Sequence, residues 1–165
     1  LVDVNDNQIG LMPKLEAHEK GVLHRAFSVF IFNKNGDLML QKRSLSKYHS
    51  PGLWTNTCCS HQRDGESNIK SGKRRLNEEM GFETMLIEKT SFIYQAKFDN
   101  GLTEHEFDHI LVGYYDKSPN INSDEVDSWK WMSMNNVQDD INESPENYTA
   151  WFKIIFKKYY KFISQ

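Results

Sequence analysis

A tight turn between two runs of strand-forming residues is the feature that most restricts how this chain can fold. Residues 26–32 are apolar and rich in β-formers, Asn35-Gly36 follows, and a second run covers 38–41. An Asn-Gly pair supplies the backbone twist that a two-stranded turn needs. The sequence therefore predicts a β-hairpin over 26–41.

A second hairpin is predicted further along, where Asp99-Asn100-Gly101 separates strand-like runs over 92–98 and 106–115. Two more strands are expected, one over 54–60 after a proline-glycine turn and a short one over 129–132. These strands together are enough to form a sheet with a buried face.

Helical segments are predicted between and after the hairpins. Residues 67–80 favour a helix, with Ser67 or Asn68 as its cap and Gly81 at its end. A short helix is expected over 135–141. A longer one should follow Ser144-Pro145, because aromatic and aliphatic residues recur there at helical spacing, namely Tyr148, Trp151, Phe152, Ile155, Phe156 and Tyr159.

The order of these elements indicates the fold class. Strands and helices mix without a repeating βαβ rhythm, which favours an α+β or α/β/α layered domain over a doubly wound sheet. The chain has 165 residues, of which 38% are hydrophobic, so it can bury one core but hardly two. We therefore expect a single domain over 1–165.

Charge and cysteine content restrict the possible partners. The formal net charge is −3 with both signs interspersed, so no general field favours nucleic acid or an anionic membrane, and an anion would need a local cluster of cations. Cys58 and Cys59 are adjacent and would close almost no loop as a disulfide. Reduced thiols, no apolar run of spanning length and a polar start from Leu1 to Gly10 lead us to expect a cytoplasmic protein.

Histidines and acidic residues gather in a pattern that suits a metal ion. His18 and His24 lie near the start, His61 ends the stretch 54–61, and Glu104-His105-Glu106 lies in a predicted strand. In an extended strand, Glu104 and Glu106 share one face and His105 takes the other; by the same rule Cys59 and His61 share a face opposite Cys58. Imidazoles with two carboxylates suit a divalent cation, whereas the two cysteines lack zinc-finger spacing.

The segment 60–82 matches most of the Nudix box, a pattern of glycine, glutamate and then Arg-Glu-apolar-x-Glu-Glu-x-Gly. The matching residues are Glu66, Arg74, Leu76, Glu78, Glu79, Gly81 and Phe82. Ser60 replaces the first glycine, and Arg75 replaces the glutamate of the Arg-Glu pair. Because the second change exchanges a metal ligand for a phosphate-binding cation, hydrolysis of a diphosphate is disfavoured.

Taken together, these pieces resemble the type 1 isopentenyl diphosphate isomerases, which have a Nudix-like fold. The resemblance spans nearly the whole chain and rests on motifs in a specific order, namely His18, His24-Arg25-Ala26-Phe27-Ser28, Arg43-Ser44-Leu45-Ser46-Lys47, Pro51-Gly52-Leu53-Trp54-Thr55-Asn56, Cys59-Ser60-His61 and Glu104-His105-Glu106. It implies a Nudix-like α/β/α domain with a mixed sheet. It also implies an isomerase of isoprenoid biosynthesis that interconverts isopentenyl and dimethylallyl diphosphate through a tertiary carbocation.

The resemblance also implies roles for individual residues. The metal ligands would be His18, His24, His61, Glu104 and Glu106, around Mg²⁺, Mn²⁺ or Zn²⁺. Glu79 and the backbone carbonyl of Cys59 would hold a Mg²⁺ ion that also touches the substrate diphosphate. The diphosphate-binding cations would be Lys14, Arg43, Lys47 and Arg75. Cys59 and Glu106 would be the acid/base pair, in an order left open, with Tyr94 supporting proton transfer and Trp151 facing the carbocation.

Plainer interpretations stand beside these assignments. Cys58 fits a small buried residue, and Trp54, Trp129 and Trp131 fit packing residues. We expect no ligand role for His49, His105 or His109, and Arg74 could serve the fold alone. The rival functions are a Nudix hydrolase and a binding module without catalysis. The expected partner is a small isoprenoid diphosphate, with no nucleic acid or membrane, and the protein would be a monomer or a homodimer.

Overall fold

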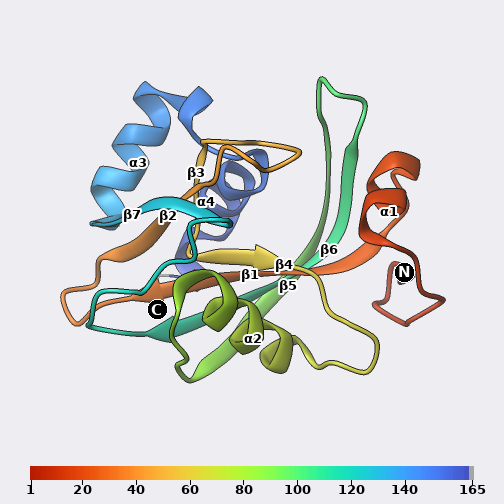
Figure 1. Ribbon diagram of the computed structural model, residues 1–165, viewed down its shortest axis with the longest axis horizontal. Coiled ribbons are helices and arrows are strands. Elements are labelled where there is room, and N and C mark those ends of the chain that lie inside the picture. The colour runs from red at the N-terminus through yellow and green to blue at the C-terminus, as the bar shows by residue number, and fades with distance from the viewer. Residues whose placement is uncertain (164–165) are drawn as a thin grey trace.

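Strand β1 (His24–Phe32) runs through the middle of the sheet in this computed structural model, which describes residues 1–163 (Figure 1). Phe27, Val29 and Ile31 point into one core cluster, while Phe30 and Phe32 point into another on the opposite face. A strand covered on both faces needs apolar residues at nearly every position, not only at alternate ones. This explains the continuous apolar run that predicts it.

Six further strands complete the sheet, namely β2 (Leu38–Arg43), β3 (Trp54–Thr55), β4 (Cys58–Ser60), β5 (Leu86–Lys97), β6 (Thr103–Tyr114) and β7 (Val126–Met132). The main order is β3-β2-β1-β6-β5, with β4 pairing to β1 and β7 pairing to β2. Strands β1 and β6 are parallel and the other pairs are antiparallel. The expected mixed sheet is confirmed.

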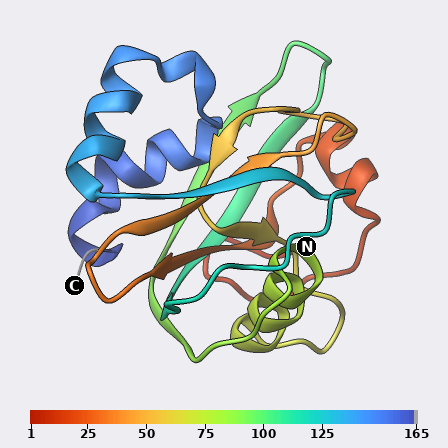
Figure 2. The same cartoon turned by 60° about the vertical axis from the view of Figure 1, so that its left-hand side comes forward.

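Helices cover the two faces of the sheet. They are α1 (Lys14–Lys20), α2 (Asn68–Met80), α3 (Met134–Glu143) and α4 (Ala150–Ile163), with a 3-10 turn at Pro145–Asn147. Helix α2 packs on one face, while α3 and α4 pack on the other, as Figures 1 and 2 show from two directions. The α+β layered arrangement predicted from the element order is therefore confirmed. Among residues 1–163, no helix has the length and apolar content needed to cross a membrane.

Helix α2 has the ends that the sequence predicts. The Ser67 side chain accepts a hydrogen bond from the Lys70 backbone N–H at 3.3 Å. Gly81 ends the helix in the left-handed conformation, with φ of 72°, and its N–H donates to the Asn77 carbonyl. A glycine adopts this conformation without the steric cost that a Cβ brings. The helix carries Arg74, Leu76, Glu78 and Glu79 of the Nudix box, with Glu66 just before it and Gly81 and Phe82 just after it.

The single strand expected over 54–60 is wrong, because the structure divides it into β3 and β4. The break falls at Asn56 and Thr57, whose side chains bond to neighbouring backbone groups. The Asn56 amide donates to the Val29 carbonyl at 3.1 Å, and the Thr57 hydroxyl donates to the Met39 carbonyl at 2.7 Å. Short polar side chains that bond to the backbone in this way compete with regular strand pairing. Before this break the segment pairs with β2, as strand β3, and after it the segment pairs with β1, as strand β4.

The C-terminal helix also begins later than predicted. Pro145 opens the 3-10 turn, and Tyr148 is extended, with φ of −120° and ψ of 145°. The Tyr148 hydroxyl donates to Asp140, and the Thr149 N–H donates to the Trp54 carbonyl at 3.0 Å. These contacts tie the segment to α3 and β3, so α4 begins only at Ala150. Tyr148 is a core residue beside the helix instead of a member of it.

Other boundaries are longer than predicted. Strand β5 begins at Leu86, six residues before the predicted run, and β6 begins at Thr103. Most side chains of β5, which lies at an edge of the sheet, are exposed, and its polar residues hide the strand pattern. Strand β7 begins at Val126, and α3 extends over Met134–Glu143. Helix α1 was not predicted, because it spans only seven residues and no side chain caps its start.

Replacing Gly81 tests how α2 is held against the neighbouring loop. A Cβ at this position would lie 2.2 Å from the Asn120 carbonyl oxygen, in addition to the strain of positive φ. Gly36 also has positive φ, of 81°, but a Cβ there would meet nothing within 4 Å. We expect Gly36→Ala to lower the unfolding free energy by about 1–2 kcal/mol and Gly81→Ala to lower it by clearly more. Equal losses in urea denaturation would contradict this account.

The ion pair within the Nudix box predicts a pH dependence of stability. Arg74 donates to both oxygens of Glu66, at 2.8 and 2.9 Å, and this hydrogen bonding lowers the pKa of Glu66 from 4.5 to about 2. A carboxyl with a depressed folded-state pKa stabilises the fold above its unfolded pKa and loses this effect as pH falls. We expect wild type to lose stability relative to Glu66→Gln between pH 4.5 and pH 2. Glu83→Gln, at an exposed position, is the control and should track wild type in acid denaturation.

Candidate active site

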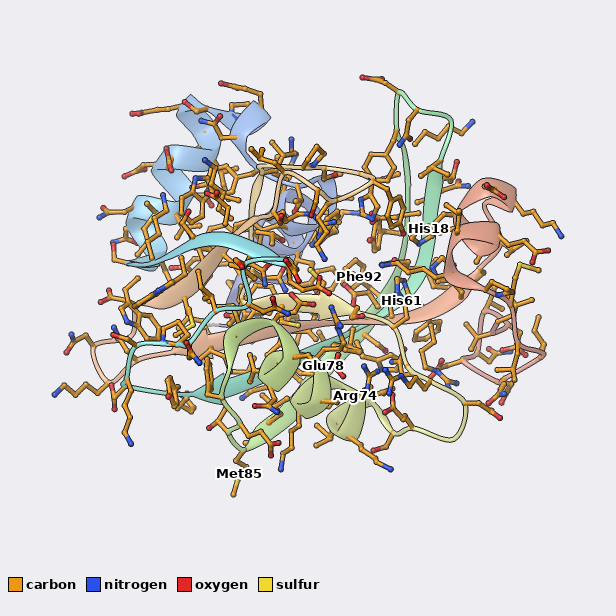
Figure 3. The ribbon with its side chains drawn as sticks, viewed as in Figure 1. His18, His61, Arg74, Glu78, Met85 and Phe92 are labelled. Carbon is orange, nitrogen blue, oxygen red and sulfur yellow. The ribbon has the colours of Figure 1, made fainter. Side chains whose placement is uncertain are left out.

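Four side chains from four parts of the chain meet in one buried group, which consists of His18, His24, His61 and Glu106. Their ligating atoms all lie within 4.8 Å of one another. His61 Nε2 lies 2.9 Å from Glu106 Oε1, and His24 Nε2 lies 3.6 Å from the same oxygen. His18 on α1 and His61 after β4 are labelled in Figure 3. All four were predicted as metal ligands.

The histidine rings are held with nitrogen atoms directed at the carboxylate. His24 Nδ1 lies 2.8 Å from the Val22 carbonyl, which leaves Nε2 for the group. His18 Nδ1 bonds to the Tyr48 hydroxyl at 3.1 Å, and its buried Nε2 has no hydrogen-bond partner among residues 1–163. Backbone and hydroxyl partners on the second ring nitrogen are typical of metal-binding histidines. The group therefore fits a divalent cation.

Burial sets the protonation states in this group. It lowers the pKa of His18 to about 3 and that of His61 to about 4, with neighbouring histidine charge adding to the effect. Burial opposes ionisation of Glu106, but the hydrogen bond from His61 and the nearby His24 ring outweigh it and hold the pKa of Glu106 well below its usual range. Neutral imidazoles and an ionised carboxylate are the forms that bind a metal.

Tyr94 connects Glu106 to a second carboxyl group. Its hydroxyl contacts Glu106 Oε2 at 2.6 Å and Glu104 Oε2 at 3.0 Å. Burial and the charge of Glu106 raise the pKa of both Tyr94 and Glu104. Glu104 shares the sheet face of Glu106, as predicted, while His105 takes the other face and bonds to the Gly21 carbonyl. Glu104 lies outside the four-residue group itself.

Cys59 on β4 contacts a small polar cluster. Its thiol donates to Asn56 Oδ1 at 3.4 Å and accepts from the Trp151 indole N–H at 3.0 Å. Burial raises the pKa of Cys59 to about 12, although Arg43 opposes this shift. The side chain is thus a neutral thiol at neutral pH. Cys58 packs in the core on the opposite face, as strand alternation predicts.

Cys59 and Glu106 line the same narrow cavity, which has a volume of about 30 Å³. Tyr94 and Trp151 belong to its wall, and so do Lys14, Arg43, His49, Ser60, His61 and Glu104. All four predicted catalytic residues therefore lie around one space, although they come from β4, β5, β6 and α4. A substrate atom in this space would face a thiol and a carboxylate at once.

A wider cavity of about 490 Å³ adjoins the narrow one, because Lys14, Ser60 and His61 line both. Its wall carries many cationic side chains, namely Lys14, Arg25, Lys47, Arg63, Arg74 and Arg75. Three of these were predicted to bind a diphosphate, and the fourth predicted cation, Arg43, lines the narrow cavity. Lysines and arginines gathered around one opening suit a multiply charged anion.

Arg75 is paired with the acidic residues of the Nudix-box helix. It lies 2.7 Å from Glu78, 2.6 Å from Glu79 and 3.2 Å from Glu125. Figure 3 shows Glu78 and Arg74 on α2, below the histidine group. Glu79 is buried and also accepts from the Gln41 amide at 2.9 Å. Arg75 therefore reduces the negative charge of the helix at the position where the Nudix box has a glutamate.

Three residues of the site were not predicted as functional. Asn56 bonds to both Cys59 and Trp151, His49 lines the narrow cavity, and Glu125 pairs with both Lys47 and Arg75. Asn56 stood in a recognised motif, but nothing in the sequence indicated which atoms its amide contacts. His49 and Glu125 lie in loop and strand-edge positions whose neighbours come from distant segments, so no local pattern marks them.

Comparison with known proteins identifies the family. The NUDIX domain matches residues 22–152. The chain is 52% identical to isopentenyl-diphosphate Delta-isomerase 2 of Photorhabdus laumondii, over 94% of this chain and 88% of that protein. It is 50% identical to isopentenyl-diphosphate Delta-isomerase of Serratia proteamaculans, over 95% of this chain and 88% of that protein.

Solved structures agree with the fold. The Deinococcus radiodurans protein DR0079 superposes with a TM-score of 0.78 at 18% identity, over 96% of this chain and 97% of that one. A MutT protein from Methanosarcina mazei gives 0.69 at 16% identity, over 84% of this chain and 94% of that one. These identities support the fold alone, whereas the sequence relatives are close over nearly the whole length. The chain therefore carries a NUDIX domain and belongs to the family of isopentenyl-diphosphate Delta-isomerases.

Proposed function

We propose that this protein interconverts isopentenyl diphosphate and dimethylallyl diphosphate, as the names of its relatives indicate for them. One observation carries the proposal: the Cys59 thiol and the Glu106 carboxylate line one narrow, buried cavity. Moving a double bond requires adding a proton at one carbon and removing a proton from another. A neutral thiol and an ionised carboxylate can perform these two steps.

The cationic opening would hold the diphosphate. Lys14, Lys47 and Arg75 line the wider cavity, and Arg43 lies at the wall of the narrow one. With the charged end held there, the five-carbon end would extend toward Cys59 past the shared wall at Lys14, Ser60 and His61. The diphosphate is remote from the reacting carbons, so its binding energy can position the alkene.

The proton transfers balance around a tertiary carbocation. In one direction, an acid gives its proton to the terminal alkene carbon, and the positive charge develops on the branched carbon. A base then removes a proton from the neighbouring carbon, and that electron pair forms the new double bond. Cys59 and Glu106 are the proposed acid/base pair, and either order is open. The raised pKa of Cys59 keeps a proton on sulfur, and hydrogen bonds hold Glu106 ionised.

The cavity wall would protect and stabilise the cation. Tyr94 bonds to Glu106, so it can orient the carboxylate and support its proton transfer. Trp151 is 3% exposed and directs its indole N–H at Cys59, which supports a role for its ring beside the reacting carbons. A ring near a desolvated cation contributes about 2 kcal/mol, and each tenfold in rate needs about 1.4 kcal/mol. The indole is therefore useful, but other groups must supply most of the rate.

Metal ions would complete the site. His18, His24, His61 and Glu106 would hold a divalent ion, with Glu104 as a further ligand, and Mg²⁺, Mn²⁺ and Zn²⁺ all suit this donor set. Glu79, with the Cys59 carbonyl, would hold Mg²⁺ against the substrate diphosphate. Bound ions would neutralise the diphosphate and fix the charge of Glu106.

A cytoplasmic location and a monomeric or dimeric state stay predictions.

Deuterium uptake tests the reaction and the acid/base pair together. Wild type with isopentenyl diphosphate in deuterated water should form labelled dimethylallyl diphosphate, measured by NMR or mass spectrometry, and a chelator should abolish this. We expect Cys59→Ala and Glu106→Gln to lower the rate by about 10²–10⁴-fold, the usual contribution of acid/base groups. Cys58→Ala, which removes the adjacent thiol from the opposite face, is the matched control and should keep most activity.

Two results would contradict the proposal. Wild type that releases phosphate from a nucleoside diphosphate derivative with Mg²⁺, yet incorporates no deuterium, would make the protein a hydrolase. Undiminished activity of Cys59→Ala would instead contradict the assignment of Cys59 to the acid/base pair, without contradicting the proposed reaction. The pairing of Arg75 with Glu78 and Glu79 favours the isomerase over the hydrolase.

Thermal unfolding tests the metal group without any substrate. Ligand binding to the folded state alone stabilises it by about 2.7 kcal/mol at a hundredfold excess over Kd. We expect Mn²⁺, Zn²⁺ or Mg²⁺ to raise Tm of metal-free wild type and His105→Ala alike. His24→Ala and His61→Ala should lose most of this shift for the ion that binds this group. The same Tm increase in all of these variants would place the bound ion elsewhere.

A further inference from the structure

His49 is a buried histidine in the loop between β2 and β3, for which no role was expected. Its side chain is 5% exposed and lines the narrow cavity that Cys59 and Glu106 also line. Nδ1 lies 3.8 Å from Glu104 Oε1, and it has no hydrogen-bond partner among the described residues. With Nδ1 unbonded, the contribution of this ring to the site is the space that it fills in the cavity wall.

Aromatic neighbours fix the plane of the His49 ring. Phe98 stacks on it with ring centroids 5.3 Å apart and an interplanar angle of 30°. Trp151 and Tyr48 meet it edge to face, with centroids at 5.9 and 4.7 Å. Phe98 packs against a face of the imidazole, and Trp151 packs beside it in the cavity wall. The ring is therefore a firm part of the wall.

The backbone of the loop is fixed as well. Arg43 donates to the carbonyls of His49 and Ser50, both at 3.1 Å, and Asn100 donates to the Tyr48 carbonyl at 3.1 Å. Ser50 adopts a positive φ of 49°, which a residue with a Cβ takes only when its surroundings require it. These contacts come from β2 and from the β5–β6 hairpin. The loop backbone that carries His49 cannot move away from the cavity without breaking them, and the aromatic neighbours hold the ring itself.

We propose that His49 is a specificity-determining residue, whose imidazole limits the size of the alkenyl group that can enter beside Cys59 and Trp151. This inference rests on the proposed isomerase function. The narrow cavity measures only about 30 Å³, less than a five-carbon group fills, so the wall side chains decide how much of the substrate's branched end can enter. An extra methylene in an apolar pocket changes kcat/KM by about 10–200-fold, so one wall residue can set the preference.

The test compares two substrates. One is isopentenyl diphosphate, and the other is its homologue with an ethyl group in place of the methyl group. We expect His49→Ala to raise the ratio of kcat/KM for the homologue over that for isopentenyl diphosphate by about tenfold or more. His49→Phe keeps a planar ring without its nitrogens, so it should leave this ratio close to the wild-type value.

Controls separate shape from stability and chemistry. His105→Ala removes the same side chain from the opposite sheet face, where it bonds to Gly21, and should not change the ratio. His49→Val shortens the side chain less than alanine does and should raise the ratio in the same direction, so the test does not depend on one variant. Circular dichroism melts would establish that each variant is folded.

The outcomes are distinct. An unchanged ratio in folded His49→Ala and His49→Val would overturn the inference. So would an equal change in His49→Phe and His49→Ala, because the ring nitrogens would then matter more than its size. A wild type that incorporates no deuterium would instead reject the proposed function. A wild type that isomerises normally, with a ratio that no His49 variant changes, would reject this inference alone.

Discussion

The backbone pairing of β1 with β6 on one side and β4 on the other determines where the reactive side chains of this protein lie. The register sets His24 opposite Glu106 and Ser28 opposite Cys59. A strand that slipped by one residue would turn every side chain to the other face. Because β1 is buried on both faces, such a slip would also disrupt the packing of both core clusters. The same apolar contacts that stabilise the fold therefore hold the site in register.

Charge is distributed unevenly between the two adjoining cavities. The narrow one is lined by a neutral thiol, a neutral tyrosine and buried carboxyls, with Lys14 and Arg43 also in its wall, while most of the lysines and arginines gather around the wider one. Burial makes an uncompensated charge expensive, so Glu106 stays ionised because His61 bonds to it and His24 lies close by. This separation suits a ligand with one highly charged end and one hydrocarbon end. The strongest attraction acts at the opening and leaves the interior free for proton transfer.

Local signals explain which parts of the fold could be predicted. The Asn35-Gly36 turn, the cap at Ser67 and the stop at Gly81 each depend on a few neighbouring residues, and the elements they bound are present. Strand alternation also separated Cys58 from Cys59 correctly. The division of 54–60 and the late start of α4 depend on contacts of Asn56 and Thr149 with distant backbone, which no local pattern shows.

The site followed the same rule, with motif residues found and loop residues missed. Resemblance to a family assigned His18, His24, His61, Glu106 and Cys59 to one site, and the structure brings them to adjoining spaces. A role for His49 was not predicted, because Arg43 and Asn100, which position its loop, come from other parts of the chain. Glu125 was not predicted for a similar reason, since its partners Lys47 and Arg75 lie far from it in sequence.

The contacts around Asn56 have a consequence for the sulfur atom. Thiol and indole both donate to Asn56 Oδ1, and the indole N–H also lies 3.0 Å from Sγ. If the thiol transfers its proton, the resulting thiolate already has a hydrogen-bond donor directed at it, the Trp151 indole N–H. A dipole that is oriented beforehand needs no rearrangement as negative charge appears, which makes ionisation of a buried sulfur less costly. The indole proposed to stabilise the carbocation would thus also stabilise the sulfur anion that the same proton transfer creates, through the N–H that already points at Sγ.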